Sequence, residues 1–145
     1  MRIVELPRKE EERKFKSRVV VVSRKDGKIL FLKRKMSYKS HPGYLDFPGG
    51  GNLKGEQPIR TAQRELQEET GMVVDRNDLT YMETLKENKK DIHIYSFFTA
   101  KHPSKQFPSR EHEDFIFLRA NEVKNYKVVP GTKRLIKKAL GKFLL

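Results

Sequence analysis

The hydrophobic positions near the start of the chain form two short runs that predict a pair of β-strands. Residues 18–23 contain four consecutive valines, and residues 28–33 read Lys-Ile-Leu-Phe-Leu-Lys. Asp26 and Gly27 lie between the two runs, and an Asp-Gly pair is typical of a tight hairpin turn. We therefore expect a β-hairpin, with Arg34 just past its second strand.

The segments around this hairpin carry no regular hydrophobic pattern. Residues 8–18 mix both charge signs around one aromatic side chain, which predicts a charged, exposed lead-in over residues 1–17. Residues 35–44 predict a loop that leads into a short apolar segment at residues 45–47. Residues 48–51 read Pro-Gly-Gly-Gly, a run that breaks regular structure and lets other groups approach the backbone closely.

The next segment predicts an amphipathic helix over residues 57–70. Pro58 suits the first turn of a helix, and Gly71 suits the position just past its end. Ile59, Ala62 and Leu66 recur at helical spacing. This apolar stripe predicts a helix that packs one face on a sheet.

Downstream, alternating positions over residues 79–85 and 91–100 predict two strands of a second hairpin. A terminal amphipathic helix is predicted over residues 130–143, with an apolar stripe of Leu135, Ile136, Ala139, Leu140 and Phe143. The remaining predicted elements are a polar loop, a short strand and one helical turn, over residues 101–114, 115–118 and 121–124. This irregular interleaving favours an α/β sandwich with a mixed β-sheet.

Composition narrows the class of protein. The 145 residues suit one domain, residues 1–145, and 35% of them are charged. Because the chain has no cysteine, disulfides and thiolate metal sites are excluded, and any metal needs oxygen or imidazole ligands. The chain also has no apolar run of signal-peptide or membrane-span length. The expected location is the cytoplasm, with no membrane partner.

The formal net charge of +13 would attract polyanions such as nucleotides or RNA. Residues 24–39 contain seven basic residues and one acid, and the terminal helix is also cationic. Two interpretations stay open. The cations form either a solvated lysine-rich surface or a patch that binds nucleic acid.

A set of fixed positions between Gly50 and Met72 carries the candidate chemistry. Seven such positions, each filled by chance with a probability of about 0.06, give odds on the order of 10⁻⁹ per starting point. In chain order they are Gly50, five residues, Glu56, seven residues, Arg64-Glu65-Leu66, one residue, Glu68-Glu69, one residue, Gly71 and Met72. A coincidental arrangement is therefore excluded in practice.

Helix geometry places Glu65, Glu68 and Glu69 within about 100° of one another, beside the apolar stripe. Three carboxylates at this spacing repel one another, and a bound cation would remove that repulsion. Oxygen ligands favour Mg²⁺, with Mn²⁺ as a substitute. The alternative is a solvated helix face in which Arg64 pairs with Glu68.

This pattern resembles the Nudix box of the Nudix hydrolases, the family that includes MutT-like proteins. The resemblance implies a Nudix-type α/β/α sandwich and metal-assisted attack of water on a diphosphate. It also implies that Glu68 and Glu69 bind divalent metal, and that Glu65 binds metal or orients the attacking water. The carbonyl of Gly49 is an expected further ligand.

Other roles follow from the same resemblance. Glu56 and Arg64 are expected to form a structural ion pair, and Gly50 and Gly71 are structural positions of the motif. Many family members add a carboxylate from a later loop, and Glu111 resembles it. Glu113 and Asp114 lie near enough in the chain to take that role, and the general base is left open between Glu65 and this loop.

Residues outside the motif would choose the substrate. Arg34 is a candidate phosphate contact, because it ends a basic strand. Tyr44 is a candidate for stacking on a base, although it could equally fill the core, whereas core filling is the expectation for Phe47. His112 is expected to be a surface histidine, with acid–base assistance as the alternative.

Three functional hypotheses result. The first is a Mg²⁺-dependent pyrophosphohydrolase of nucleoside triphosphates or related small nucleotides. The second applies the same chemistry to RNA 5′ ends or dinucleotide polyphosphates, with the basic surface binding RNA. The third is a non-catalytic Nudix module that senses nucleotides or binds RNA. A homodimer is possible in each case, and the sequence shows no interface.

Overall fold

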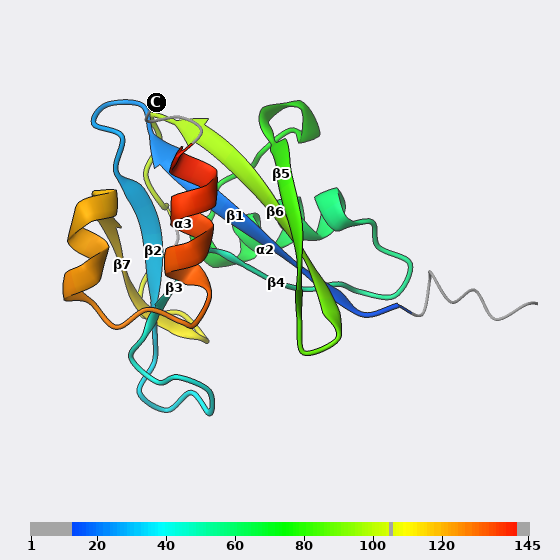
Figure 1. The fold of residues 1–145 in the computed structure, drawn as a ribbon, viewed down its shortest axis with the longest axis horizontal. Coiled ribbons are helices and arrows are strands. Elements are labelled where there is room, and N and C mark those ends of the chain that lie inside the picture. Colours follow the sequence, from blue (N-terminus) through cyan, green and yellow to red (C-terminus); the bar gives the residue numbers. More distant parts are fainter. Residues whose placement is uncertain (1–12, 105, 142–145) are drawn as a thin grey trace, which may run out of the picture.

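The computed structural model describes residues 13–104 and 106–141, which form a mixed β-sheet with helices on both faces (Figure 1). The strand order is β3-β2-β1-β6-β5, with β4 paired to β1 and β7 paired to β2. Strand β1 (Phe15–Ser23) lies at the centre and runs parallel to β6 (Lys90–Thr99) along its whole length. The remaining strands are β2 (Ile29–Arg34), β3 (Leu45–Asp46), β4 (Gly49–Gly51), β5 (Thr80–Glu87) and β7 (His112–Leu118).

Alternating side chains of the central strands divide the core into two layers. Val19 and Val21 pack with the helix α2 (Pro58–Thr70) on one face. Val20 and Val22 pack with α3 (Thr132–Gly141) on the other face. In Figure 1, α3 crosses the face turned to the viewer and α2 lies behind the sheet. The unbroken valine run is explained, because a strand covered on both faces needs apolar residues at every position.

The predicted sandwich is confirmed, and so are most of its elements. α2 begins within one residue of the predicted helix start, and Gly71 ends it in the left-handed conformation at φ 79°. β5 and β6 pair antiparallel, as expected for the second hairpin. Two short 3₁₀ helices complete the fold, η1 (Arg76–Asp78) and η2 (Ala120–Asn125), and the second covers the predicted helical turn.

The first hairpin is confirmed, although the hairpin pairing is short. β1 and β2 are antiparallel across the Asp26-Gly27 turn, with Val22 opposite Ile29. β2 pairs instead mainly with β7, and β1 with β6. Beyond the turn, β1 and β2 therefore pair mainly with strands that are distant in the sequence. No local pattern in the sequence predicts this pairing.

Four sequence boundaries were wrong. Residues 15–17 belong to β1 and not to an exposed lead-in, because Phe15 and Ser17 are buried against neighbouring elements. Residues 49–51 were expected to interrupt regular structure, but they form the strand β4, since they pair with β1. Arg34 is the last residue of β2 and not the first residue after it, and β7 begins at residue 112 because its first residues pair with the end of β2.

Parts of two predictions lie outside the described residues. These are residues 1–12 of the predicted lead-in and the side chains of Ala139, Leu140 and Phe143 in the terminal stripe. The stripe residues Leu135 and Ile136 are buried as expected. Within the described ranges, no helix combines the length and the apolar character needed to cross a membrane.

Candidate active site

The carboxylates of α2 are aimed by the packing of the helix. Ala62 and Leu66 are fully buried against the sheet, and this fixes the rotation of α2 about its axis. The Glu69 side chain is only 9% exposed, whereas that of Glu68 is 57% exposed. Glu65 lies between these extremes at 16%. The three glutamates therefore form a row along α2, the carboxylate edge, in which side-chain exposure increases from Glu69 through Glu65 to Glu68.

Strand β4 meets this edge through its glycines. The Gly49 N–H donates a hydrogen bond of 2.7 Å to Glu69 Oε1. A Cβ added at Gly50 would stand 2.7 Å from the carboxyl carbon of Glu65, and one at Gly49 would stand 2.1 Å from the carbonyl oxygen of Ser17. Backbone occupies the space at Gly49 and the Glu65 carboxylate occupies it at Gly50, so neither position has room for a side chain.

Glu56 and Arg64 form the predicted ion pair, with Arg64 Nε 2.8 Å from Glu56 Oε2. The Leu53 N–H and the Thr61 hydroxyl also donate to Glu56, at 3.0 and 2.7 Å. Hydrogen bonding from Arg64 is the largest cause that lowers the pKa of Glu56 to about 2. Arg64 also donates to the carbonyl of Gly51 at 2.9 Å. The pair thereby ties the loop before α2 to both the helix and β4.

Arg64 reaches the other glutamates as well. Its Nη1 lies 3.0 Å from Glu65 Oε1 and 3.2 Å from Glu68 Oε2. The Arg64–Glu68 pair proposed as an alternative to metal binding is therefore present. It does not neutralise the edge, because one guanidinium faces Glu56, Glu65 and Glu68 together.

On the opposite side of the edge, β7 contributes His112, and the expectation of a surface histidine is wrong. His112 is 3% exposed because the start of β7 pairs with the end of β2, opposite Arg34. Its Nε2 lies 3.4 Å from Asp46 Oδ1, and its Nδ1 lies 3.7 Å from Glu69 Oε2. The imidazole therefore sits between two buried carboxylates.

Arg34 supports the same group of side chains. Its Nε donates to Asp46 Oδ2 at 2.7 Å, and its Nη1 donates to the Ser40 carbonyl at 2.7 Å. Arg34 is only 7% exposed, but it lines both neighbouring cavities, so its predicted contact with phosphate stays a prediction. The guanidinium is committed largely to Asp46 and to the loop between β2 and β3.

Burial and neighbouring charges set opposite pKa shifts within the site. Burial raises the pKa of Glu65 and raises that of Glu69 well above its ordinary value, against the opposing effect of the Gly49 N–H on Glu69. Burial also acts to raise the pKa of Asp46, but His112, Arg18 and Arg34 outweigh it and the net shift is downward. A carboxyl such as Glu69 accommodates its charge best when a cation lies beside it.

The structure brings together most of the residues predicted to hold metal. Glu65, Glu68, Glu69 and Glu111 line one cavity of about 380 Å³. Ligand atoms of Glu69, Glu111 and His112 lie within 4.8 Å of one another. The buried Nδ1 of His112 has no hydrogen-bond partner among the described residues. This donor set of oxygens and one nitrogen fits a divalent cation.

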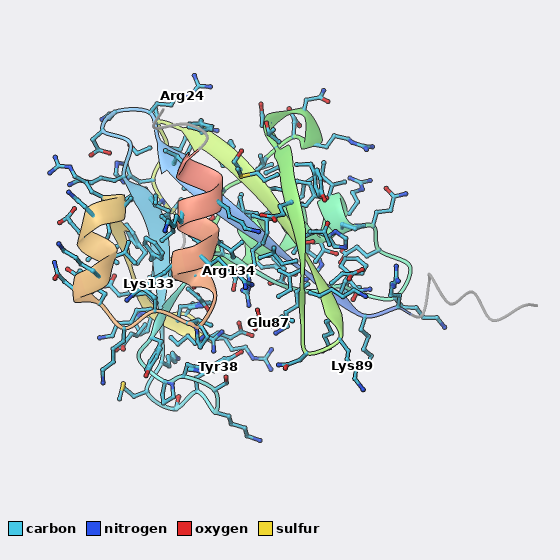
Figure 2. All side chains as sticks on the ribbon, viewed as in Figure 1. Arg24, Tyr38, Glu87, Lys89, Lys133 and Arg134 are labelled. Atoms are coloured by element: carbon cyan, nitrogen blue, oxygen red, sulfur yellow. The ribbon has the colours of Figure 1, made fainter. Side chains whose placement is uncertain are left out.

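Two further cavities are lined by cations, and one of them includes carboxylates of α2. One of about 230 Å³ includes Glu65, Glu69 and Tyr38, and one of about 200 Å³ extends to Glu87 and Thr132. Figure 2 shows Tyr38 and Glu87 on the side where the loop after β2 and the β5–β6 hairpin approach the start of α3. The lining residues shared by the two cavities are Lys16, Arg18, Arg34, Ser40 and Asp46.

The structure places the two aromatic candidates, Tyr44 and Phe47, in different surroundings. Tyr44 is half-buried against the His41 ring, at 5.2 Å, and is absent from the lining of these cavities. Phe47 is buried and stacks on Phe31 at 5.3 Å, which confirms core filling. Tyr38, which the pattern did not single out, lies under the Arg34 guanidinium at 5.0 Å.

Sequence reasoning also missed Lys16, Arg18 and Asp46, and it placed His112 at the surface. Lys16 and Arg18 are two residues apart on one face of β1, so a longer strand assignment would have indicated them. Asp46 and His112 carried no such signal, because only pairing of β2 with β3 and β7 brings them together.

Comparisons with known proteins agree with this geometry. Residues 13–139 match the family model described as NUDIX domain. An uncharacterized Nudix hydrolase of Listeria monocytogenes is 37% identical over 57 residues, which are 39% of this chain and 34% of that protein. The match thus spans about a third of that relative's length.

Solved structures share the fold at low sequence identity. The NUDIX domain of Shewanella oneidensis NrtR complexed with ADP ribose is 19% identical, with a TM-score of 0.75 over 89% of this chain and 87% of that one. A C. elegans Ap4A hydrolase binary complex is 23% identical, with a TM-score of 0.68 over 89% of this chain and 97% of that one.

Proposed function

This chain belongs to the NUDIX domain family, and on that premise we propose that it is a Mg²⁺- or Mn²⁺-dependent pyrophosphohydrolase of small nucleotides. The observation that carries the proposal is the cavity in which Glu65, Glu68 and Glu69 of α2 face Glu111. Four carboxylates around one cavity make a strong site for divalent cations and a poor one for an anion alone. A diphosphate would enter it together with metal.

Different residues of the site would bind the metal and orient the attacking water. A bound divalent cation would neutralise charge on the diphosphate and activate a water. Glu68, Glu69 and Glu111 would hold it, while the Gly49 N–H fixes the Glu69 carboxylate. Arg64 holds Glu65 at 3.0 Å, in position to orient the attacking water and accept its proton. The Gly49 carbonyl is a further candidate ligand.

The adjoining cations support an anionic substrate. Lys16 and Arg18 line the cavity that contains Glu65 and Glu69, and they also line the neighbouring cavity. Burial, followed by the charge of Arg18, lowers the pKa of Lys16, so an anion placed there would stabilise the charged ammonium. We infer that the phosphates span from the carboxylate edge toward Lys16, and that the group attached to them occupies the cavity near Thr132.

The shared fold supports a nucleotide as that substrate. One structural relative was solved with ADP ribose, a nucleoside diphosphate joined to a second sugar, and another is an Ap4A hydrolase. A nucleoside triphosphate or a related small nucleotide is the leading candidate here. Arg34 would assist by holding the cavity wall, and Tyr44 would contribute only from outside these cavities.

RNA 5′ ends and dinucleotide polyphosphates form the second candidate class. The favouring observation is the row of exposed cations on α3, which includes Lys133, Arg134 and Lys137. A third interpretation, a non-catalytic module, is disfavoured because every glutamate of the motif is retained. A homodimer is not needed to complete the carboxylate edge.

Substitution of Glu69 by Gln tests the proposed reaction. Glu69→Gln keeps the shape and can still accept from the Gly49 N–H, but it removes a negative charge beside the metal. We expect hydrolysis of the best substrate to fall by at least about 100-fold, with the thermal unfolding midpoint nearly unchanged. The measurement is phosphate or pyrophosphate release from a nucleotide panel with Mg²⁺ or Mn²⁺.

Asp78→Asn, an exposed change on η1, serves as the matched control and should retain full turnover. Turnover of Glu69→Gln near the wild-type rate would contradict the assignment. Release from none of the panel by the wild-type protein would favour the non-catalytic module.

A further inference from the structure

His112 presents an unusual nitrogen to the carboxylate site. The residue is 3% exposed, and its Nδ1 has no hydrogen-bond partner among the described residues. Burial without a partner is unfavourable for a polar ring nitrogen, so this atom is open to a partner such as a water or an ion. The groups near Nδ1 therefore indicate which partner fits.

Nδ1 lies toward the carboxylate of Glu69, and Glu111 belongs to the same group of possible metal ligands. Glu69 Oε2 lies 3.7 Å away, which is too long for a hydrogen bond. An oxygen of Glu111 completes a set of ligand atoms within 4.8 Å of one another. Three donors at this separation, converging from α2 and from the start of β7, leave room for one cation among them.

The other ring nitrogen determines which atom is free to bind. His112 Nε2 lies 3.4 Å from Asp46 Oδ1, and Arg34 Nε holds Asp46 Oδ2 at 2.7 Å. A histidine that turns its N–H toward a carboxylate exposes the lone pair of the opposite nitrogen, and metal-binding histidines commonly have such a carboxylate behind them. Asp46, which Arg34 holds, is thus the carboxylate behind the ring on the side away from Glu69.

We propose that His112 supplies a nitrogen ligand, with Glu69 and Glu111, to a divalent metal in this site, and that the site favours transition metals such as Mn²⁺ or Zn²⁺ over Mg²⁺. Imidazole prefers such metals, whereas Mg²⁺ prefers oxygen alone. The inference rests on the proposed function, since it names the metal chemistry of the same cavity. It also explains why four ionisable groups, Arg34, Asp46, Glu69 and His112, share one buried cluster.

The competing explanation is a buried ion pair in which a protonated His112 bridges Asp46 and Glu69. That arrangement requires Nδ1 to donate to Glu69, and the 3.7 Å separation does not provide the bond. The two explanations differ in one observable, which is direct coordination of nitrogen to a bound metal.

The test is pulsed electron paramagnetic resonance of the full chain loaded with one equivalent of Mn²⁺, without substrate. We expect ¹⁴N coupling from a coordinated imidazole in the wild-type protein and its loss in His112→Gln. His102→Gln, which changes an exposed histidine, should keep the coupling. Calorimetric titration should show Mn²⁺ affinity lowered at least about 10-fold by His112→Gln, with a smaller effect on Mg²⁺.

Absence of ¹⁴N coupling in the wild-type protein would overturn the proposal, whatever the variants do. A folded His112→Gln variant with wild-type Mn²⁺ affinity would overturn it too. Asp46→Asn should weaken Mn²⁺ binding by about 10-fold through loss of ring orientation. Because these measurements use no substrate, metal-dependent hydrolysis without nitrogen coupling would leave the proposed function standing and remove only this inference.

Discussion

Glu56 shows at the scale of one residue how the loop before α2 is held. Its carboxylate accepts from the Arg64 guanidinium, the Leu53 N–H and the Thr61 hydroxyl. These donors all favour the charged form, so the pKa of Glu56 lies at about 2. A carboxyl whose pKa is lower in the folded state stabilises the fold above its unfolded pKa and loses that contribution as the pH falls.

The pH dependence of unfolding tests this account. Between pH 6 and pH 3 the free energy of unfolding should fall further in the wild-type protein than in Glu56→Gln, because only the former protonates Glu56 on unfolding. After solvent screening we expect a difference of about 1 to 2 kcal/mol, measured by urea denaturation. Parallel curves for the two proteins would show that the ion pair with Arg64 contributes nothing to stability.

At the scale of elements, β4 is placed by contacts that only glycine permits. The strand pairs with β1 on one side and receives the carboxylates of α2 on the other. A Cβ at Gly50 would enter the Glu65 carboxylate, whereas one at Gly51 would meet only the Phe15 carbonyl oxygen, at 3.9 Å. Neighbouring glycines of one strand therefore have different roles.

This difference predicts that alanine at Gly50 lowers turnover and that alanine at Gly51 does not. Gly50→Ala should displace the Glu65 carboxylate and lower metal-dependent turnover at least about 10-fold, because small displacements of catalytic groups are costly. Gly51→Ala should leave turnover within about twofold, as the matched control. Steady-state kinetics and thermal unfolding of both variants check this, and equal activity in the two would contradict the close approach of Glu65 to β4.

At the scale of the whole molecule, cations lie both beside the carboxylates of α2 and on α3. The carboxylate edge lies beside α2, while the cations of α3 cover the other face, where Figure 2 shows Lys133 and Arg134. The net charge of +13 acts over the entire surface and would raise the local concentration of anionic substrates. A small nucleotide would interact mainly with the cations beside the carboxylates, whereas a long polyanion would also reach the cations of α3.

Salt dependence distinguishes those substrates. Between about 50 and about 200 mM KCl, kcat/KM for triphosphorylated RNA should fall more steeply than for a nucleoside triphosphate if RNA reaches the α3 cations. The double variant Lys133→Gln and Lys137→Gln should reduce the RNA slope and leave the mononucleotide slope unchanged. Equal slopes for both substrates in the wild-type protein would count against RNA as a substrate.

The sequence by itself determined the parts of this protein that depend on local spacing. Helical periodicity and terminal glycine defined α2, and the same spacing placed Glu65, Glu68 and Glu69 on one edge. The Glu56–Arg64 ion pair also followed from the motif and is present. These features survive because neighbours along one helix, or across one short loop, keep their relative positions in any fold that contains them.

Only the tertiary structure decided which distant residues complete the site. His112 was expected at the surface and Arg34 just past its strand, yet pairing of β7 and β3 with β2 buries both around Asp46. Such contacts depend on sheet order and register, which the alternation of a single strand does not encode. One segment of the sequence was thus enough to predict the row of glutamates on α2, whereas the position of His112 beside it depends on strand pairing.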